Sequence, residues 1–475
     1  MKKAGLFPLL IAVLHFLTAH AAAAEVKSPE YWKNQALQEI IPFWEKTIDR
    51  EYGGFYTNVS EDGTVSDTAD KYTRMHSRVL YGFTAAYMLS GEDKYLDYAK
   101  HAFEFMDEYC YDRDNGGWHT SVDAGGTPNG GDKNLFDITY GNLGPVYYYF
   151  VTGNKKALRF VTDTHNLTVK YAYDPDNGGF YSAAGADWRR TTSSKSFNAQ
   201  IDAFTAYLLY YYLATKDPAL LKFIKEHADT VLTKMIDKKS AYVGENFSYN
   251  WDWLENTLWA GHNLKTGWVL ARVYSLTGDK KYLTAASNIA KAQIGRAWDG
   301  KYGGWYYKFE NDSTKSADTT KDWWTQQEGS MLMLTLYPES KISDYLDKFE
   351  KTSLFWDKYF MDPKYGECRQ TLTASGEVIN AVKGDYYKSA YHTMEQALFN
   401  YLYLNLYVNK TPAELYFRFD NDDENAVRYL KPVEAPRVRL KSVTVNGENW
   451  TDFDEKECSV RLPKGEKIRV KAVFI

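Results

Sequence analysis

The chain has 475 residues and a formal net charge of −5 at neutral pH, so it is mildly acidic and long enough to bury a large core. Because it has no basic run, we do not expect it to bind the phosphate backbone of nucleic acids or an anionic lipid surface. Its three cysteines, Cys110, Cys368 and Cys458, have neither the spacing of a metal site nor the number needed for a disulfide framework.

The first residues have the layout of a cleaved secretory signal. Lys2 and Lys3 precede an apolar stretch from Ala4 to about Leu17, and alanines occupy positions 21–24. This stretch is too short for a membrane anchor, and no later apolar run reaches the roughly 20 residues that a spanning helix needs. We therefore expect a signal peptide over residues 1–24 and a secreted or periplasmic protein that is not inserted in a membrane.

A repeat organises the chain from residue 25 to about 410. Tight turns recur every 60 to 65 residues or so, at Gly53, Gly116, Gly178, Gly244, Gly303 and Gly366. Each unit has an aromatic-rich helix, such as 73–89, then an amphipathic helix, then a short hairpin. Antiparallel helix pairs that leave an apolar flank open stack side by side, and six pairs can close into a ring. The repeat predicts an all-α (α/α)6 toroid, a six-hairpin barrel, over residues 25–410.

The pattern changes from helical to alternating at about Thr411. Strands are expected at 415–419, 438–445, 458–462 and 467–474, with Asn446-Gly447 as a hairpin turn. We therefore expect a small C-terminal all-β module over residues 411–475. Its simplest role is a structural cap, and the alternative is accessory carbohydrate binding.

Unusual polar residues gather where the inner helices of such a ring begin. All these helices would start at one mouth, where their positive dipole ends favour polar or anionic ligands. The candidate site residues are Arg78, Asn198, Asp202, His262, Lys265, Trp323, Trp324, Glu328, Tyr387 and His392. Among them, the aromatic residues are candidate platforms for sugar rings. Asn198 is a candidate for binding hydroxyls, and Glu328 for orienting a base or contacting the sugar.

His262 and His392 occupy matching positions in the fourth and sixth units. Imidazole can both take and return a proton near neutral pH. Two imidazoles on opposite faces of a sugar can remove the proton beside its carbonyl and replace it from the other side, which is epimerisation at C2. Arg78 is the expected partner of the enediolate oxyanion. His76, on the same predicted helix as Arg78, is expected to be structural.

At these positions the chain resembles the N-acylglucosamine 2-epimerase family, which includes cellobiose 2-epimerases and ketose–aldose isomerases acting on mannose-like sugars. The resemblance covers about residues 30–408 and rests on His-Ser-Arg-Val-Leu ending at Leu80, Lys195-Ser196-Phe197-Asn198, Gly261-His262, Trp323-Trp324 with Glu328, and Tyr391-His392. It implies an (α/α)6 barrel with no redox or nucleotide cofactor for the chemistry, and we expect no metal in the site. It also implies roles for individual residues: proton transfer by His262 and His392, substrate oxygens held by Arg78, and a pocket lined by Asn198, Trp324, Glu328 and Tyr387.

Two residues depart from this family's pattern. Lys265 stands where the family commonly has an acidic residue three positions after the first histidine, and Asp202 stands where it often has a histidine. A carboxylate beside an imidazole orients it, whereas a nearby cation depresses the pKa of the imidazole. An ion pair between Asp202 and Lys265 across adjacent inner helices would keep the site neutral.

Two other functions fit the same residues. A glycoside hydrolase on this scaffold needs two carboxylates roughly 5 to 10 Å apart, and Asp202 with Glu328 or Asp137 are the candidates. A sugar-binding protein that has lost the chemistry is the other alternative, and Lys265 motivates it. We favour a 2-epimerase or aldose–ketose isomerase that acts on a mono- or oligosaccharide as a monomer or homodimer. The sequence leaves the identity of the sugar open.

Overall fold

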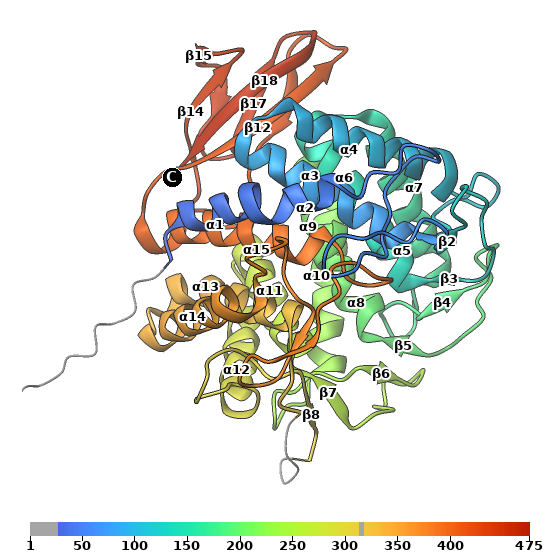
Figure 1. The fold of residues 1–475 in the computed structure, drawn as a ribbon, viewed down its shortest axis with the longest axis vertical. Helices are drawn as coiled ribbons and strands as arrows, with labels where there is room; N and C mark the ends of the chain where they lie inside the picture. The colour runs from blue at the N-terminus through green and yellow to red at the C-terminus, as the bar shows by residue number, and fades with distance from the viewer. Residues whose placement is uncertain (1–26, 313–317) are drawn as a thin grey trace, which may run out of the picture.

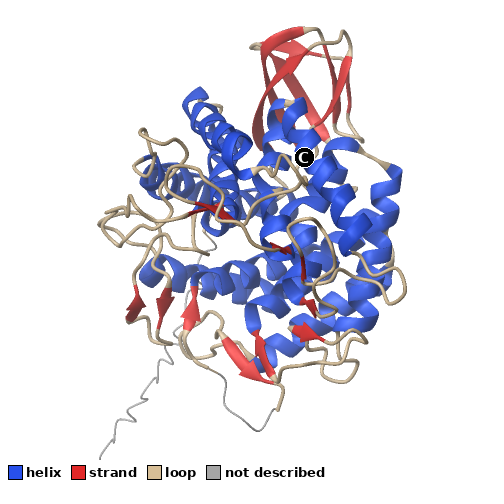
Figure 2. Cartoon of the chain, turned by 90° about the vertical axis from the view of Figure 1, so that its right-hand side faces the viewer, coloured by secondary structure: helices blue, strands red, loops and turns tan. Residues whose placement is uncertain are grey.

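The computed structural model describes residues 27–312 and 318–475, and the predicted signal peptide lies outside this range. The described chain is mainly helical, with its strands in small sheets (Figures 1 and 2). None of the described helices is both long and apolar enough to cross a membrane. Cys110, Cys368 and Cys458 are buried and unpaired, so no disulfide links them.

The helices follow one another in pairs along the chain. Helix α1 (Pro29–Gln35) continues through a π-helical turn into α2 (Ile41–Glu45). The next units are α3 (Thr73–Ser90) with α4 (Asp93–Phe105), α5 (Leu135–Gly141) and α6 (Leu143–Thr152) with α7 (Lys155–Ala172), and α8 (Phe197–Ala203) and α9 (Leu209–Thr215) with α10 (Pro218–Thr230). They are followed by α11 (Ala260–Thr277) with α12 (Lys280–Arg296), α13 (Trp323–Ser340) with α14 (Ser343–Phe355), and α15 (Ala390–Tyr403).

The two members of each pair differ in burial, and α3 and α4 illustrate the difference. Every residue of α3 from Thr73 to Leu89 is buried. In α4 the buried residues recur at helical spacing, as Tyr95, Leu96, Ala99 and Ala102 do, so that helix covers the core with one face. The chain turns between the two helices at Gly91, whose φ of 73° is the left-handed conformation that glycine adopts without strain. The first helix of a pair is therefore internal and the second external.

Short antiparallel ladders join the starts of five inner helices to the next hairpin. They pair β1 (Lys71–Tyr72) with β2 (Ser121–Val122), β3 (Lys133–Asn134) with β4 (Ala183–Ala184), β5 (Lys195–Ser196) with β6 (Asn246–Phe247), and β7 (Thr257–Trp259) with β8 (Lys308–Glu310). A fifth ladder joins β9 (Lys321–Asp322) to β10 (Thr371–Leu372), which also pairs with β11 (Val378–Asn380). These ladders fix the position at which the inner helices begin.

Buried aspartate–lysine pairs join five of the hairpin turns to the segment that leads into the next inner helix. They are Asp49–Lys71 at 2.6 Å, Asp112–Lys133 at 2.9 Å, Asp174–Lys195 at 2.7 Å, Asp299–Lys321 at 2.8 Å and Asp362–Lys383 at 3.1 Å. Each aspartate also accepts N–H groups of its own turn, as Asp49 does from Glu51 and Tyr52. The fourth unit departs from this pattern, because Asp237 is exposed and Leu258 stands two residues before α11, where four other units have the lysine.

The last strands form two antiparallel sheets at one end of the molecule, the top of Figure 1, where β12 contacts α3 and α6. One sheet has the order β12 (Ala413–Asn421), β18 (Gly465–Phe474), β14 (Leu440–Val445) and β15 (Glu448–Trp450). The other has the order β13 (Ala426–Tyr429), β17 (Ser459–Leu462) and β16 (Phe453–Asp454). The strands expected from the alternating pattern correspond to β12, β14, β17 and β18, and the expected turn at Asn446-Gly447 joins β14 to β15.

A buried segment between β13 and β14 contacts the inner helices far from their first turns. Glu434 of this segment pairs with Arg272 of α11 through two hydrogen bonds, one of them 2.9 Å from Nε to Oε2, and the two side chains are 1% and 2% exposed. The hydroxyl of Tyr210 in α9 donates to the Pro432 carbonyl at 2.6 Å. These contacts join the C-terminal strands to the helical part of the chain.

Replacing Glu434 by alanine is expected to lower the free energy of unfolding by about 3 to 5 kcal/mol, because the buried Arg272 guanidinium loses its counter-charge. Urea denaturation at neutral pH measures the change. The matched control is Asp452→Ala, which removes one partner of the exposed Asp452–Arg461 pair and should change stability by less than about 0.5 kcal/mol. Equal losses in the two variants would contradict the importance of the buried pair.

Candidate active site

A cavity of about 580 Å³ opens where the inner helices begin. Nine of the ten predicted site residues line it: Arg78, Asn198, Asp202, His262, Lys265, Trp323, Trp324, Tyr387 and His392. Glu328 does not line the cavity, because its side chain is fully buried behind the wall. Glu245, Trp259, Tyr307 and Lys308 also line it, although they were not among the predicted residues.

The His262 ring is held on both faces and at one nitrogen. Phe197 stacks on one side with the ring centroids 3.8 Å apart, and Trp259 stacks with centroids 5.1 Å apart, each within 10° of parallel. Nδ1 lies 2.6 Å from Oε2 of Glu245, whose other oxygen accepts the Trp259 backbone N–H at 2.9 Å. With its faces covered and Nδ1 engaged, the ring has its Nε2 edge left for a ligand in the cavity.

The His392 ring is also held at Nδ1, but by a neutral amide. Nδ1 lies 2.6 Å from Oε1 of Gln327, and the Trp323 ring stands edge-on at 6.0 Å. Burial, and then the positive charges of Arg78 and Lys265, hold the pKa of His392 well below its usual value. The ring is therefore neutral near pH 7 and able to accept a proton.

Trp324 lies beside both histidines. Its ring centroid is 5.2 Å from that of His262 and 6.3 Å from that of His392. A side chain at Gly261 would bring its Cβ to 2.2 Å from the Trp324 ring, so glycine is needed there for this packing. The two imidazoles, from α11 and α15, therefore meet at one cavity, as the sequence predicted.

Lys265 and Asp202 form a buried ion pair at 2.6 Å, and both side chains are 3% exposed. The ammonium also donates to the Tyr140 hydroxyl at 3.0 Å, and the Asn198 amide donates to Asp202 at 2.8 Å. Burial alone would raise the pKa of Asp202, but the charge of Lys265 and the donor from Asn198 outweigh it and hold this pKa below its usual value. The predicted pairing across adjacent inner helices is confirmed.

Arg78 faces the cavity without a carboxylate partner in the described ranges. Its Nη1 donates to the Tyr387 carbonyl, and its guanidinium lies 4.0 Å from the centroid of the Tyr140 ring. The neighbouring Arg74 pairs with Asp137 instead, so Asp137 is engaged. The charge of Arg78 thus remains available for a ligand oxygen.

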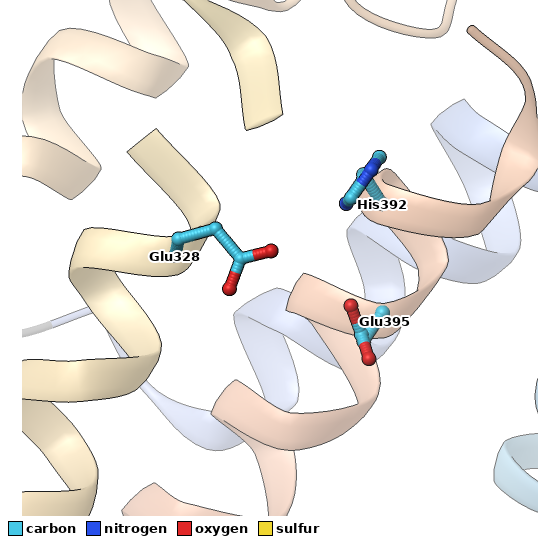
Figure 3. Close-up of side chains that lie close together, drawn as sticks. All are labelled: Glu328, His392 and Glu395. Atoms are coloured by element: carbon cyan, nitrogen blue, oxygen red, sulfur yellow. The ribbon is translucent and has the colours of Figure 1, made fainter. Parts of the chain in front are cut away.

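Glu328 and Glu395 form a cluster with His392 at the edge of the cavity, in which Glu328 extends from α13 toward the α15 helix that carries the other two (Figure 3). One ligand atom from each lies within 4.8 Å of the others, a spacing that would suit a metal ion. The surroundings fit a metal poorly, because both Glu395 oxygens accept hydrogen bonds and the Lys265 ammonium lies 3.7 Å from Glu328.

The two carboxyl groups of this cluster differ in their hydrogen bonds. Glu395 accepts from the Tyr391 hydroxyl at 2.9 Å and from the Gln327 amide, whereas neither Glu328 oxygen has a hydrogen-bond partner among the described residues. Burial raises the pKa of both groups. Because hydrogen bonds favour the ionised form, the shared proton belongs on Glu328 and the negative charge on Glu395.

Three residues that hold the histidines were missed by the sequence analysis. Gln327 and Glu395 lie close in sequence to the predicted residues Glu328 and His392, but nothing in the sequence indicated that their side chains contact a histidine or its partner. Glu245 follows the fourth glycine turn by one position, 17 residues before His262, and nothing in the sequence links the two. His76 is structural as expected: it stacks on Phe105, its Nε2 accepts the Phe55 N–H, and burial lowers its pKa to about 3.

Comparisons with known proteins place these observations in a family. The family model described as N-acylglucosamine 2-epimerase (GlcNAc 2-epimerase) matches residues 54–396. The chain is 24% identical to cellobiose 2-epimerase of Bacteroides fragilis, over 74% of this chain and 93% of that protein. It is 22% identical to D-mannose isomerase of Marinomonas mediterranea, over 75% of this chain and 93% of that protein.

The fold has a similar match among solved structures. Cellobiose 2-epimerase from Bacillus thermoamylovorans superposes with a TM-score of 0.74 and 25% identity, covering 78% of this chain and 98% of that one. The described helices and small sheets therefore follow the architecture of these epimerases over most of the chain.

Replacing Lys265 by methionine is expected to lower the free energy of unfolding by about 3 to 5 kcal/mol at pH 7, because the Asp202 carboxylate is left buried without its counter-charge. The loss should shrink as the pH falls toward about 4, where Asp202 can take up a proton in the variant. Urea denaturation across this pH range measures it. The double variant Lys265→Met/Asp202→Asn should recover most of the loss, and a double variant as unstable as the single one would contradict the pairing.

Proposed function

The chain belongs to the N-acylglucosamine 2-epimerase family, and from this premise we propose that it is a carbohydrate 2-epimerase or aldose–ketose isomerase. The observation that carries the proposal is the meeting of His262 and His392 at one cavity, beside Trp324. Each ring is held at Nδ1, which leaves Nε2 for the substrate. The names of the similar proteins, cellobiose 2-epimerase and D-mannose isomerase, support the same class of reaction.

The proposed reaction begins with an open-chain sugar whose carbonyl oxygen faces Arg78. His392, which is neutral, takes the C2 proton, and the electron pair moves into an enediolate whose oxyanion the Arg78 guanidinium stabilises. His262 that carries a proton on Nε2 gives it to the opposite face of C2, which yields the 2-epimer, and the proton gained by His392 passes back to His262 through solvent before the next turnover. A proton returned to C1, with the C2 hydroxyl proton passing to O1, gives the ketose. Both outcomes conserve atoms and electrons, so the same pair of imidazoles serves either one.

The six-hairpin (α/α)6 toroid belongs to the same proposal. Contacts between inner helices support it, since α3 packs on α5 and α6, α5 on α8, α8 on α11, α11 on α13, α13 on α15, and α15 again on α3. Helix α1 packs on α15 and would complete the sixth pair from the other end of the chain. We likewise infer that residues 411–475 form a separate β module that caps the far end of the ring.

A glycoside hydrolase is less well supported, because its candidate carboxylates are engaged or withdrawn. Asp202 is paired with Lys265 and Asp137 with Arg74. Glu328 lies behind the cavity wall. A sugar-binding protein without catalysis differs from the enzyme only in whether proton exchange occurs.

Three further expectations stay predictions. They are the signal peptide over residues 1–24, the secreted or periplasmic location that it implies, and a monomeric or homodimeric state. A carbohydrate as the substrate follows from the family and fits a cavity lined by aromatic rings and hydrogen-bonding groups.

Proton NMR in heavy water tests the reaction directly. Incubation with a panel of mannose- and glucose-type mono- and disaccharides should show deuterium entering C2 of an epimer, or C1 of a ketose. His262→Asn and His392→Asn should each lower the exchange rate by at least about 100-fold, since each removes a proton-transfer group. His119→Asn, at a histidine that does not line the cavity, is the matched control and should leave the rate unchanged.

The same spectra separate the alternatives. Cleavage of a glycosidic bond that survives His392→Asn but is lost in Asp202→Asn would identify a hydrolase. Sugar binding without any exchange in the unsubstituted protein would identify a binding protein.

A further inference from the structure

We propose that Gln327 and Glu395 are positioning residues for His392, which fix its ring in the tautomer with hydrogen on Nδ1 and the lone pair of Nε2 toward the cavity. The tautomer itself is a property of the free protein. Its consequence, that His392 is ready to act as a base, rests on the function proposed above.

The orientation of the Gln327 amide is the first step. Its nitrogen contacts Oε2 of Glu395 and lies 3.0 Å from the sulfur of Met331, and both of these atoms are acceptors. The amide must therefore present N–H groups to that side and its oxygen to His392. Since the oxygen can only accept, Nδ1 of His392 must carry the hydrogen across the 2.6 Å contact.

The charge on Glu395 is the second step. Glu395 accepts from the Gln327 amide and from the Tyr391 hydroxyl, so both of its oxygens act as acceptors. The neighbouring Glu328 has no such donors, and it takes the proton that the pair shares. An ionised Glu395 prevents the Gln327 amide from turning over, because a turned amide would set two oxygens against each other.

The other charged groups around His392 keep the ring neutral. They are Arg78 from α3, Lys265 and His262 from α11, Lys388 from the segment before α15, Glu328 from α13 and Glu395 from α15 itself. The cations among them lower the pKa of His392 in addition to burial. The ionised Glu395 carboxylate lies within 4.8 Å of the ring, but its hydrogen bonds come from the Gln327 amide and the Tyr391 hydroxyl. A neutral ring with hydrogen on Nδ1 has its Nε2 lone pair free.

The two histidines are thus held in different ways. His262 donates to a carboxylate, Glu245, which can stabilise a positive ring directly. His392 donates to a neutral amide, which orients the ring without adding charge to it. Gln327 therefore sets the geometry of His392 and leaves its low pKa intact.

Nitrogen-15 NMR of histidine-labelled protein tests the tautomer without any substrate. The ring signals of His392 are identified by their loss in His392→Asn. We expect the unsubstituted protein at pH 7 to show a protonated Nδ1 and an unprotonated Nε2, and Gln327→Ala to show a mixture of the two tautomers. Hydrogen on Nε2 in the unsubstituted protein would overturn the proposal, whatever the enzyme's activity.

Kinetics in heavy water test the consequence. Gln327→Ala should lower kcat by about 10- to 100-fold with KM changed less than about threefold, because an orienting partner of a catalytic ring is lost. Gln327→Glu should move the acid limb of the kcat/KM profile to higher pH by at least about one unit, since a carboxylate on Nδ1 stabilises the charged ring. A merely structural role for Gln327 would move neither the limb nor the tautomer.

Two further variants keep the outcome interpretable. Glu395→Gln frees the Gln327 amide to turn and should reduce kcat even where Gln327→Glu does not fold. Gln35→Ala removes a buried glutamine of α1 that contacts Trp356 and does not line the cavity, and it should leave both kcat and the His392 signals unchanged. If the tautomer is as expected but no sugar exchanges deuterium, the proposed function fails and the positioning role of Gln327 stands. If Gln327→Ala keeps full kcat and a single tautomer, the positioning role fails.

Discussion

One ammonium group, that of Lys265, holds together the charges beneath the cavity. It pairs with Asp202 at 2.6 Å, donates to Tyr140 and lies 3.7 Å from Glu328. Burying an ionised carboxylate in this region without a counter-charge would cost several kcal/mol, so the floor of the cavity depends on this one cation. Lys265 also contributes to the low pKa of His392. The same side chain therefore forms a structural ion pair and helps to keep the His392 ring neutral.

The same electrostatics explain why the two imidazoles have different partners. His262 is clamped between Phe197 and Trp259 and donates to the Glu245 carboxylate. At His392 a carboxylate in direct contact would counteract the nearby cations and raise the pKa of the ring. At His392 the hydrogen-bond partner of Nδ1 is instead the neutral Gln327 amide, which in turn donates to Glu395. In the proposed reaction one ring accepts a proton before the other donates one, and the different partners of the two rings support that order.

The sequence predicted the site residues that lie at positions set by the repeat. His262, His392, Arg78 and Lys265 recur at helix starts with the period of the repeat, so their meeting at one mouth could be inferred. Their partners could not, because Glu245 reaches His262 from a hairpin loop and Gln327 reaches His392 from a neighbouring helix. Contacts of this kind depend on how segments far apart in the chain fold over one another. For Glu328 the prediction was wrong in the opposite way. The residue lies near the start of α13 as expected, but its side chain is buried behind the cavity wall and does not line the cavity.

The fourth unit shows how the repeat is altered where the site requires it. Elsewhere a lysine before the inner helix pairs with a buried aspartate of the preceding turn, and four of these lysines stand two residues before that helix. In the fourth unit Leu258 takes that place, Asp237 is exposed, and Glu245 binds the Trp259 N–H and His262 instead. The Glu245 backbone carbonyl still accepts from Phe197 at 2.6 Å, as the corresponding carbonyl of Tyr307 accepts from Ala260 in the next unit. The backbone hydrogen bond of the repeat is therefore kept, while before α11 the aspartate–lysine pair is absent and the Glu245 carboxylate holds the His262 ring.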